Sequence, residues 1–160
     1  MTKKCISHNK LIIVKNKKCY YNYKIIDEFE SGLILLGWEI KSIRAKKVSI
    51  NNSYVLFHDN EAYLFGSNFQ PVFTITKHIN CEPIRNRKLL LHRKEIDFMI
   101  GKMNKERYSI IALSLYWKKN LCKLKIGMGI GKSKFDKRMY EKNNAWKLEK
   151  NRILKNKKNS

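Results

Sequence analysis

The feature that most restricts the fold of this chain is a series of apolar segments, each of strand length, separated by tight polar turns. Two such turns are His58-Asp59-Asn60 and Lys118-Lys119-Asn120. Asn and Asp readily adopt the left-handed conformation that short hairpins require, so each turn predicts a hairpin. The predicted hairpin strands are Ser53–Phe57, Glu61–Phe65, Tyr108–Trp117 and Leu121–Gly127, and in the third strand Ile111, Leu113, Leu115 and Trp117 alternate to share one face.

One long strand and two helices complete the predicted fold. Tyr20–Leu36 is rich in β-branched and aromatic residues, and Ile25, Phe29 and Leu33 are spaced to share one strand face, with Gly32 suited to a bend. The segments with helical spacing are Trp38–Ala45 and Arg93–Met103. We predict a mainly β fold, an OB-like antiparallel β-barrel with two to three short helices and a disordered basic C-terminal tail. Closure of the barrel would remove exposed strand edges.

Net charge divides the chain into three parts. The 160 residues include 35 Lys and Arg against 13 Asp and Glu, a formal net charge of +22, concentrated towards both ends. Such a charge favours a polyanionic partner, and nucleic acid is favoured because neutralised phosphates release counterions. We expect a basic arm at residues 1–15, an RNA-binding barrel at 16–131 and a basic tail at 132–160.

The tail carries apolar residues at a regular spacing. Met139, Trp146 and Ile153 follow one another at seven-residue intervals among Lys and Arg, which on a helix gives one narrow stripe. Too few apolar residues exist to hold this helix alone, so we expect a tail that is disordered alone and helical on its partner. Before the tail, the glycines between Gly127 and Gly131 suggest a hinge that RNA phosphate could approach closely.

The sequence gives little support for catalysis. Glu28 and Glu30 would share a strand face and could hold a metal ion for RNA cleavage, but a solvated strand face is the simpler interpretation. The cysteines and histidines are scattered, so we expect reduced thiols, no metal and no cofactor. We also expect no membrane partner and a cytoplasmic location, since no apolar run reaches the roughly 18 residues of a span and no signal segment is present.

Four motifs, in order, resemble the SsrA-binding protein (SmpB) family, the partner of transfer-messenger RNA (tmRNA, SsrA). They are Gly37–Arg44 (GWEIKSIR), Arg87–His92 (RKLLLH), Ala112–Lys118 (ALSLYWK) and Asp136–Arg138 (DKR). The resemblance runs from about Asn16 to the C-terminus and implies an OB-like RNA-binding barrel.

The resemblance also implies a role in trans-translation. The barrel would bind the tRNA-like domain of tmRNA and deliver it to a stalled ribosome, where the tail would occupy the vacant decoding site and mRNA channel. The ribosome would perform the chemistry, so that the nascent chain is tagged for degradation and the ribosome released. Further implied partners are ribosomal RNA of the small subunit and, indirectly through the aminoacylated RNA, elongation factor Tu with GTP. We expect a monomer and no enzymatic activity.

The resemblance assigns residues to two RNA contacts. The residues at the tRNA-like domain, with two lysines that add charge beside it, are Glu30, Leu90, His92, Gly131, Lys132 and Lys134. The residues at the decoding site and along the mRNA channel are Phe135, Asp136, Lys137, Arg138, Trp146, Ile153 and Leu154.

The chain departs from the family pattern at five positions. Ile130 and Ser133 replace lysines, which predicts weaker local phosphate contact, and Phe135 replaces a Tyr or His. Lys46 occupies a position where a turn glycine is common, and Cys19 interrupts a basic segment.

The alternative function is a structural RNA-binding protein of the ribosomal type. Such a protein would have basic arms but no preference for a tRNA-like fold.

Overall fold

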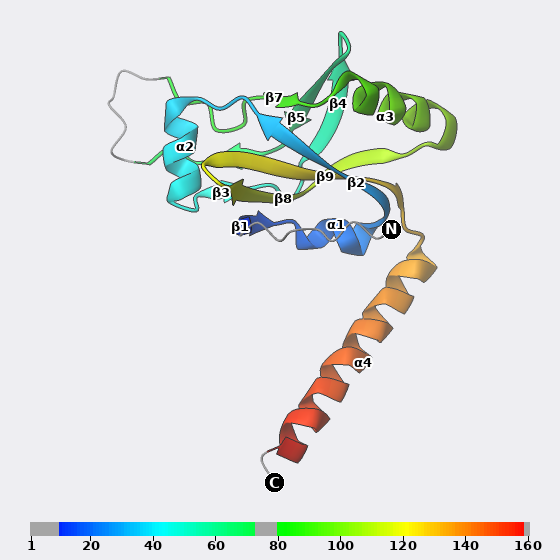
Figure 1. Cartoon of the computed structure of the whole chain (residues 1–160). Helices are drawn as coiled ribbons and strands as arrows, with labels where there is room; N and C mark the ends of the chain where they lie inside the picture. Colours follow the sequence, from blue (N-terminus) through cyan, green and yellow to red (C-terminus); the bar gives the residue numbers. More distant parts are fainter. Residues whose placement is uncertain (1–9, 73–79, 159–160) are drawn as a thin grey trace, which may run out of the picture.

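The computed structural model describes residues 10–72 and 80–158. Within these residues, the main sheet is antiparallel, with strand order β1-β8-β4-β5-β7-β2-β9, and it closes because β9 also pairs with β8 (Figure 1). The main-sheet strands are β1 (Lys10–Lys15), β2 (Tyr23–Leu33), β4 (Tyr54–His58), β5 (Glu61–Phe65), β7 (Arg87–Leu90), β8 (Ser109–Lys118) and β9 (Leu121–Gly131). A second small sheet pairs β3 (Val48–Ser49) with β6 (Asn68–Phe69). The prediction of a mainly β, OB-like antiparallel barrel is confirmed.

Four helices accompany the barrel in the described part of the chain. They are α1 (Lys17–Asn22), α2 (Gly37–Arg44), α3 (Arg93–Glu106) and α4 (Lys134–Lys158). The two helices predicted from apolar spacing are confirmed as α2 and α3. The tail is drawn as the long helix α4, which points away from the barrel (Figure 1). That the tail is disordered without its partner stays a prediction. Strand β1 lies within the segment expected to be an arm.

Helix α1 replaces the first part of the strand that was predicted to begin at Tyr20. Its N-cap is the buried Asn16, whose side chain accepts a hydrogen bond from the Cys19 amide at 3.2 Å. The Asn16 side chain also donates to the carbonyls of Ile50 and Ala112, at 3.1 and 3.0 Å. These bonds fix the turn before α1 to the barrel. A capping asparagine therefore overrides the strand propensity of the following tyrosines.

Two β-bulges divide the apolar residues between two cores. In β2, the register shifts between Ile25 and Asp27, and in β8 it shifts on either side of Leu113. A bulge reverses the inside-outside alternation, so Ile25 packs under α1 with Leu113, whereas Phe29 packs against the main core. The prediction of one shared face for Ile25, Phe29 and Leu33, and of simple alternation along β8, was wrong for this reason.

Both predicted hairpins are confirmed, each with a two-residue turn. His58 pairs with Glu61, and the intervening Asp59 and Asn60 have φ angles of +48° and +61°. Lys118 pairs with Leu121 across a turn in which Lys119 has a φ of +55°. Positive φ at both turn positions of the first hairpin, and at the first turn position of the second, matches the right-handed strand twist and fixes the register.

The glycines near the end of β9 form tightly packed strand rather than a hinge. A Cβ atom on Gly127 would lie 2.8 Å from a methyl carbon of Leu113. On Gly129, it would lie 2.5 Å from the Lys24 carbonyl oxygen. The hinge prediction was wrong at these positions because β9 stays paired with both β2 and β8 through this segment. Gly129 allows the β2 backbone to approach β9 closely, and Gly127 makes room for the Leu113 side chain.

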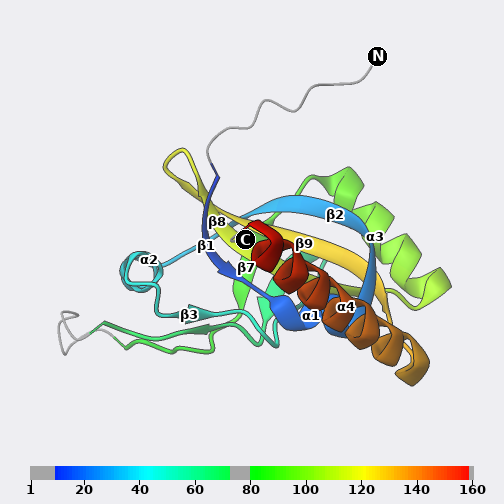
Figure 2. The same cartoon turned by 90° about the horizontal axis from the view of Figure 1, so that it is seen from below.

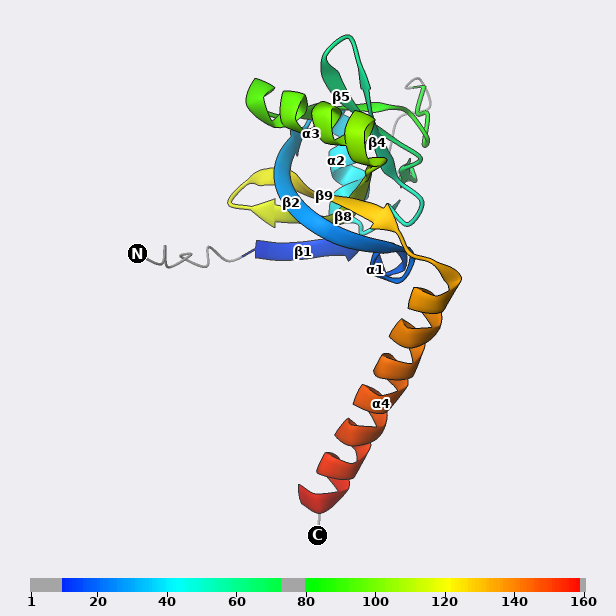
Figure 3. The same ribbon diagram turned by 90° about the vertical axis from the view of Figure 1, so that its right-hand side faces the viewer.

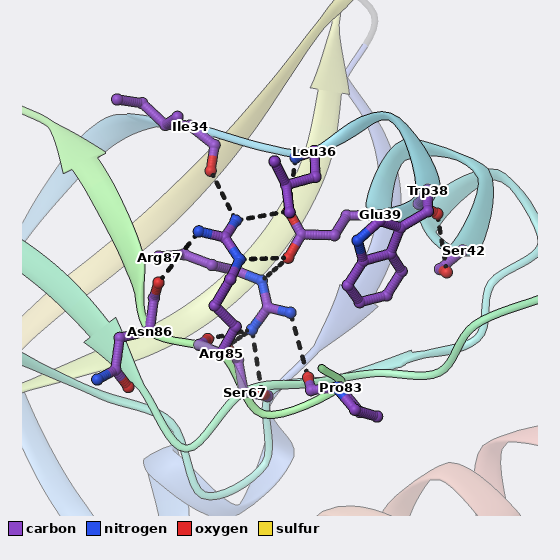
Figure 4. Close-up of polar contacts among 10 residues, drawn as sticks. All are labelled: Ile34, Leu36, Trp38, Glu39, Ser42, Ser67, Pro83, Arg85, Asn86 and Arg87. Atoms are coloured by element: carbon purple, nitrogen blue, oxygen red, sulfur yellow. Dashed lines mark hydrogen bonds and ion pairs between the residues drawn. The ribbon is translucent and has the colours of Figure 1, made fainter. Parts of the chain in front are cut away.

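A buried ion-pair network joins α2 to β7 (Figure 4). The fully buried Glu39 accepts hydrogen bonds from Arg87 Nε at 2.8 Å and from Arg85 Nη2 at 2.8 Å. Arg87 also donates to Ser67 and lies 3.8 Å from the centre of the Phe69 ring. Burial lowers the pKa of Arg87, although Glu39 opposes this effect. The network explains why the GWEIKSIR and RKLLLH motifs occur together: their charges neutralise each other inside the fold.

The cysteines in the described part of the chain, Cys19, Cys81 and Cys122, are free thiols, as predicted. Burial raises the pKa of Cys19 to about 11 and that of Cys122 to about 12. Both thiols are therefore protonated at neutral pH and are poor nucleophiles. Cys19 is the buried residue of α1 and packs with Ile111 and Leu113, so its departure from the family pattern contributes to the second core. Cys5 lies outside the described residues.

Candidate nucleic-acid interface

The side chain of Glu30, on β2, is held in place by two side chains of β8, which lies on the far side of β9. The buried Tyr116 hydroxyl donates a hydrogen bond to Glu30 Oε2 at 2.5 Å, and Lys118 Nζ lies 2.7 Å from Oε1. Burial and this hydrogen bond raise the pKa of Tyr116. Nearby, Glu28 forms an ion pair with Lys125 of β9. Both carboxylates therefore order lysine side chains on the outer face of the barrel.

Leu90 lies close to Glu30 at one end of the barrel. It pairs with Gly32, and a Cβ on Gly32 would stand 3.2 Å from the Cβ of Leu90. The Leu90 side chain is 54% exposed, which is unusual for a leucine next to a closed core. His92 follows as the N-cap residue of α3. The structure thus gathers Glu30, Leu90 and His92 at the end of β2 and β7.

Gly131, Lys132 and Lys134 lie at the opposite end of β2. Gly131 pairs with Tyr23, seven residues before Glu30 in the same strand. At about 3.3 Å per residue, the two groups are separated by roughly 23 Å along the strand. The six residues expected at the tRNA-like domain are therefore two clusters on one barrel side, and an RNA that contacts both must be extended along β2.

The root of α4 is docked against α1 (Figures 2 and 3). The Tyr21 hydroxyl donates a hydrogen bond to Glu141 at 2.7 Å, and its ring meets the Tyr140 ring edge-on with centroids 6.1 Å apart. Lys132 Nζ donates to the Tyr20 carbonyl at 2.7 Å and lies 4.1 Å from the centre of the Tyr140 ring. These contacts fix the direction in which α4 leaves the barrel.

The DKR segment begins the helix. The Asp136 amide donates a hydrogen bond to the Ser133 hydroxyl at 3.2 Å, and the Ser133 amide donates to the Asp136 carboxylate at 3.2 Å. The Ser133 hydroxyl also donates to this carboxylate, at 2.8 Å. This is a capping box, and the hydrogen bonds from Ser133 lower the pKa of Asp136. Lys137 Nζ lies 5.6 Å from the Tyr21 ring centre, whereas Phe135 and Arg138 are exposed. The segment thus combines a helix start with projecting aromatic and cationic groups.

Beyond its root, α4 exposes its apolar residues. Met139, Trp146 and Ile153 are 45%, 70% and 51% exposed, and the seven-residue spacing places them on one stripe, as predicted. On a helical wheel, Phe135 lies about 40° from Met139 and so extends the stripe. Leu154 is also exposed, about 100° around the helix from Ile153. This stripe faces away from the side of α4 that meets α1 through Tyr140.

Sequence reasoning did not identify the residues that position the site. Tyr116 and Lys118, which hold Glu30, lie in the ALSLYWK motif that carried the resemblance, so the motif was found but its contact was not. Tyr21 and Glu141 are 120 positions apart, and no spacing pattern connects them. Only the barrel closure brings such pairs together.

A closed basic barrel that presents ordered lysines, with a long exposed cationic helix attached at one end, defines a nucleic-acid-binding protein. The family model described as "SmpB protein" matches residues 13–156, so the chain belongs to the SmpB family. Its structure is also similar to a chain in the solved structure "tmRNA-SmpB: a journey to the center of the bacterial ribosome". That match has 32% sequence identity and a TM-score of 0.60, and it covers 76% of this chain and 85% of the other.

Membership of this family makes the protein an RNA-binding adaptor of trans-translation and not an enzyme. The alternative of an RNA-cleaving enzyme is thereby overturned. The two carboxylates on which it rested are engaged by cations in the structure: Glu28 by Lys125 and Glu30 by Lys118. In the described part of the chain, no helix is long and apolar enough to cross a membrane.

Proposed function

We propose that this protein binds the tRNA-like domain of tmRNA through its barrel and places its C-terminal helix in the vacant decoding site and mRNA channel of a stalled ribosome. The observation that carries the proposal is the exposed stripe of α4. A helix that is fixed at its root and leaves Trp146 and Ile153 in solvent is built to meet a partner.

In this proposal, the barrel clusters recognise a folded RNA shape. Glu30, Leu90 and His92 form one end of the contact, and Gly131, Lys132 and Lys134 form the other. The barrel presents these groups from paired strands, so their spacing is fixed before binding. A fixed spacing selects one RNA fold, since double-stranded RNA is read mostly through its shape and backbone.

The helix performs the second part of the function. Phe135, Asp136, Lys137 and Arg138 stand at its start and would enter the decoding site, where codon and anticodon normally meet. The side chains of Trp146, Ile153 and Leu154 would contact the mRNA channel further along. A cationic helix suits a channel lined by phosphates, because each neutralised phosphate releases counterions.

The remaining steps belong to the partners. Elongation factor Tu with GTP would join through the aminoacylated RNA, and the ribosome would transfer the nascent chain and switch template. The chain would then be tagged for degradation and the ribosome released. We place this monomeric adaptor in the cytoplasm, where ribosomes work, with no membrane partner, cofactor or metal.

A gel-shift titration of the full chain with the tRNA-like domain tests the barrel part of the proposal. Excess ordinary tRNA serves as competitor, at several salt concentrations. Binding that survives competitor and moderate salt is the expected result. Binding that ordinary tRNA abolishes, with a steep salt dependence, would mean that the +22 charge alone drives association.

Replacement of Asp136, Lys137 and Arg138 by alanine tests the helix part. Tagging of a stalled nascent chain should stop, while binding to the tRNA-like domain persists. A ribosomal-type structural protein would instead show equal affinity for unrelated structured RNAs, and the substitution would leave no specific defect in tagging.

A further inference from the structure

Two hollows on the outside of the barrel meet at one tyrosine, Tyr20 of α1. One hollow lies on the outer face of β1, β8 and β9, and the other lies between β2 and the root of α4. We infer that these hollows form a track for an unpaired RNA strand, with Tyr20 as the stacking platform between two pairs of lysines. The inference deepens the proposed function, on which it rests, by adding a single-strand contact to the shape contact of the barrel.

The outer-face hollow has a volume of about 370 Å³ and is bounded by Ile12, Lys15, Tyr20, Ser114, Tyr116 and Lys125. Its two lysines come from β1 and β9, on opposite sides of β8, and Lys125 is ordered by its ion pair with Glu28. Ile12 is 47% exposed and gives the hollow an apolar wall. An apolar wall between two cations matches a nucleotide, with a flat base and a phosphate on either side.

The root hollow is larger, at about 650 Å³, and it adds two more tyrosines and two more lysines. Its lining includes Tyr23, Lys24, Lys132 and Tyr140, and it shares Tyr20 with the first hollow. Asp27 and Glu28 also line it, and Glu28 is paired with Lys125 of the first hollow. Lys132 is held in place by its bond to the Tyr20 carbonyl. Figures 1 and 3 show β1, α1 and the root of α4 following one another along the same side of the barrel.

The chemistry of this track favours single-stranded RNA over a duplex. Tyr20 is 41% exposed and lines both hollows, so part of its side chain is accessible to a base. Burial, followed by the nearby Glu28 carboxylate, raises the pKa of the Tyr20 phenol and keeps it neutral. Bases inside a duplex are already stacked, whereas an unpaired strand can place its bases on tyrosine rings and its phosphates on lysines.

The test is a binding titration of the full chain with a labelled unstructured oligouridylate, at several salt concentrations. Tyr20→Leu should weaken binding about tenfold, because one base–aromatic stack is lost. Tyr20→Phe keeps the ring and should bind within about twofold of the parent chain. The matched control is Tyr54→Leu, since Tyr54 of β4 is 46% exposed, stacks on Phe65 and lines neither of the two hollows.

A lysine pair provides the second arm of the test. Lys125→Gln should lower the slope of log affinity against log salt by about 0.7, as expected for one lost phosphate contact on a single strand. Lys102→Gln removes the same charge and breaks the same kind of Lys–Glu pair on α3, and it should leave the slope unchanged.

Equal effects of Tyr20→Leu and Tyr54→Leu, with thermal unfolding unchanged in both, would overturn the inference. So would unchanged RNA affinity in Tyr20→Leu together with weaker binding of an acidic peptide, which would assign the track to a protein. The proposed function fails separately, if the parent chain shows no preference for the tRNA-like domain. Failure of the Tyr20 variants alone leaves that preference intact.

Discussion

The barrel and helix α4 place their charged side chains in opposite surroundings. In the barrel, Glu39 and Arg87 are fully buried and neutralise each other, and the bulges of β2 and β8 direct apolar residues into two cores. In α4, the charged side chains from Lys142 to Arg152 are exposed, and the root of the helix touches α1. The barrel shape is therefore determined by its own interior, whereas the position of α4 depends on a few contacts and on whatever binds its free face.

Removal of α4 tests this division most strongly. A chain that ends at Ser133 should lose all tagging of stalled nascent chains, because the proposed decoding-site and channel contacts are gone. Its barrel should unfold at nearly the same urea concentration as the full chain, since the core residues all precede the helix. Parallel tagging and urea-unfolding measurements check both halves. A large loss of barrel stability would show that the two regions are one cooperative unit.

Disruption of the buried ion pair should destabilise the barrel, in contrast to removal of α4. Glu39→Ala leaves the Arg87 guanidinium buried without its carboxylate, and the expected loss is about 3–5 kcal/mol in the free energy of unfolding. Urea denaturation followed by tryptophan fluorescence measures it. The control is Glu61→Ala, which breaks an exposed pair with Lys88 and should cost far less. Similar losses in both variants would contradict the importance of burial.

The start of α4 provides a smaller effect. Ser133→Ala removes the capping hydroxyl and should destabilise the first turn of α4 by about 1 kcal/mol. Amide hydrogen exchange should rise in the first turn of α4 and stay unchanged in the barrel.

The stability of the same cap depends on pH. Because the pKa of Asp136 is lowered in the folded state, its contribution is present above the ordinary aspartate pKa of 3.8 and is lost as the pH falls through the lowered value.

A single turn residue provides the smallest effect and the only expected gain. Lys46 follows α2 with a φ of +57°, and its amide donates a hydrogen bond to the Ile43 carbonyl. Lys46→Gly should stabilise the barrel by about 0.5–1 kcal/mol, because glycine adopts this left-handed conformation without strain. Thermal unfolding measures the gain. Lys47→Gly, at the next position, should show none.

Local signals predicted the elements of this structure better than their packing. Asp59 and Asn60 specified a hairpin turn because their own backbone preference suffices. The predicted strand faces of Ile25 and Leu113 were wrong, because a bulge depends on how the neighbouring strands pair and not on the residue type. The interpretation of Gly127 and Gly129 as a hinge was wrong for the same reason. The sequence alone does not distinguish a mobile glycine from one that is packed against another strand.

The candidate site divides in the same way. The resemblance supplied Leu90 and Asp136, which stand in recognisable motifs, and Glu30, which precedes the motif that begins at Gly37. It did not supply the partners that hold them, such as Tyr116, because a contact between two strands leaves no spacing in the sequence. The resemblance did mark Lys46 as a position where a turn glycine is common, and the structure shows a left-handed residue there.

The length of α4 has a consequence for how far this protein can extend. Its 25 residues rise about 37 Å when fully helical, and the contact between Tyr21 and Glu141 fixes the helix near its start. The position of the far end therefore depends on the number of residues that follow this contact. One inserted residue would shift the far end by about 1.5 Å but rotate it by about 100°. Seven inserted residues would move the end by about 10 Å and return Trp146 and Ile153 to nearly the same heading. Rotation and distance can therefore be varied separately by the choice of insertion length.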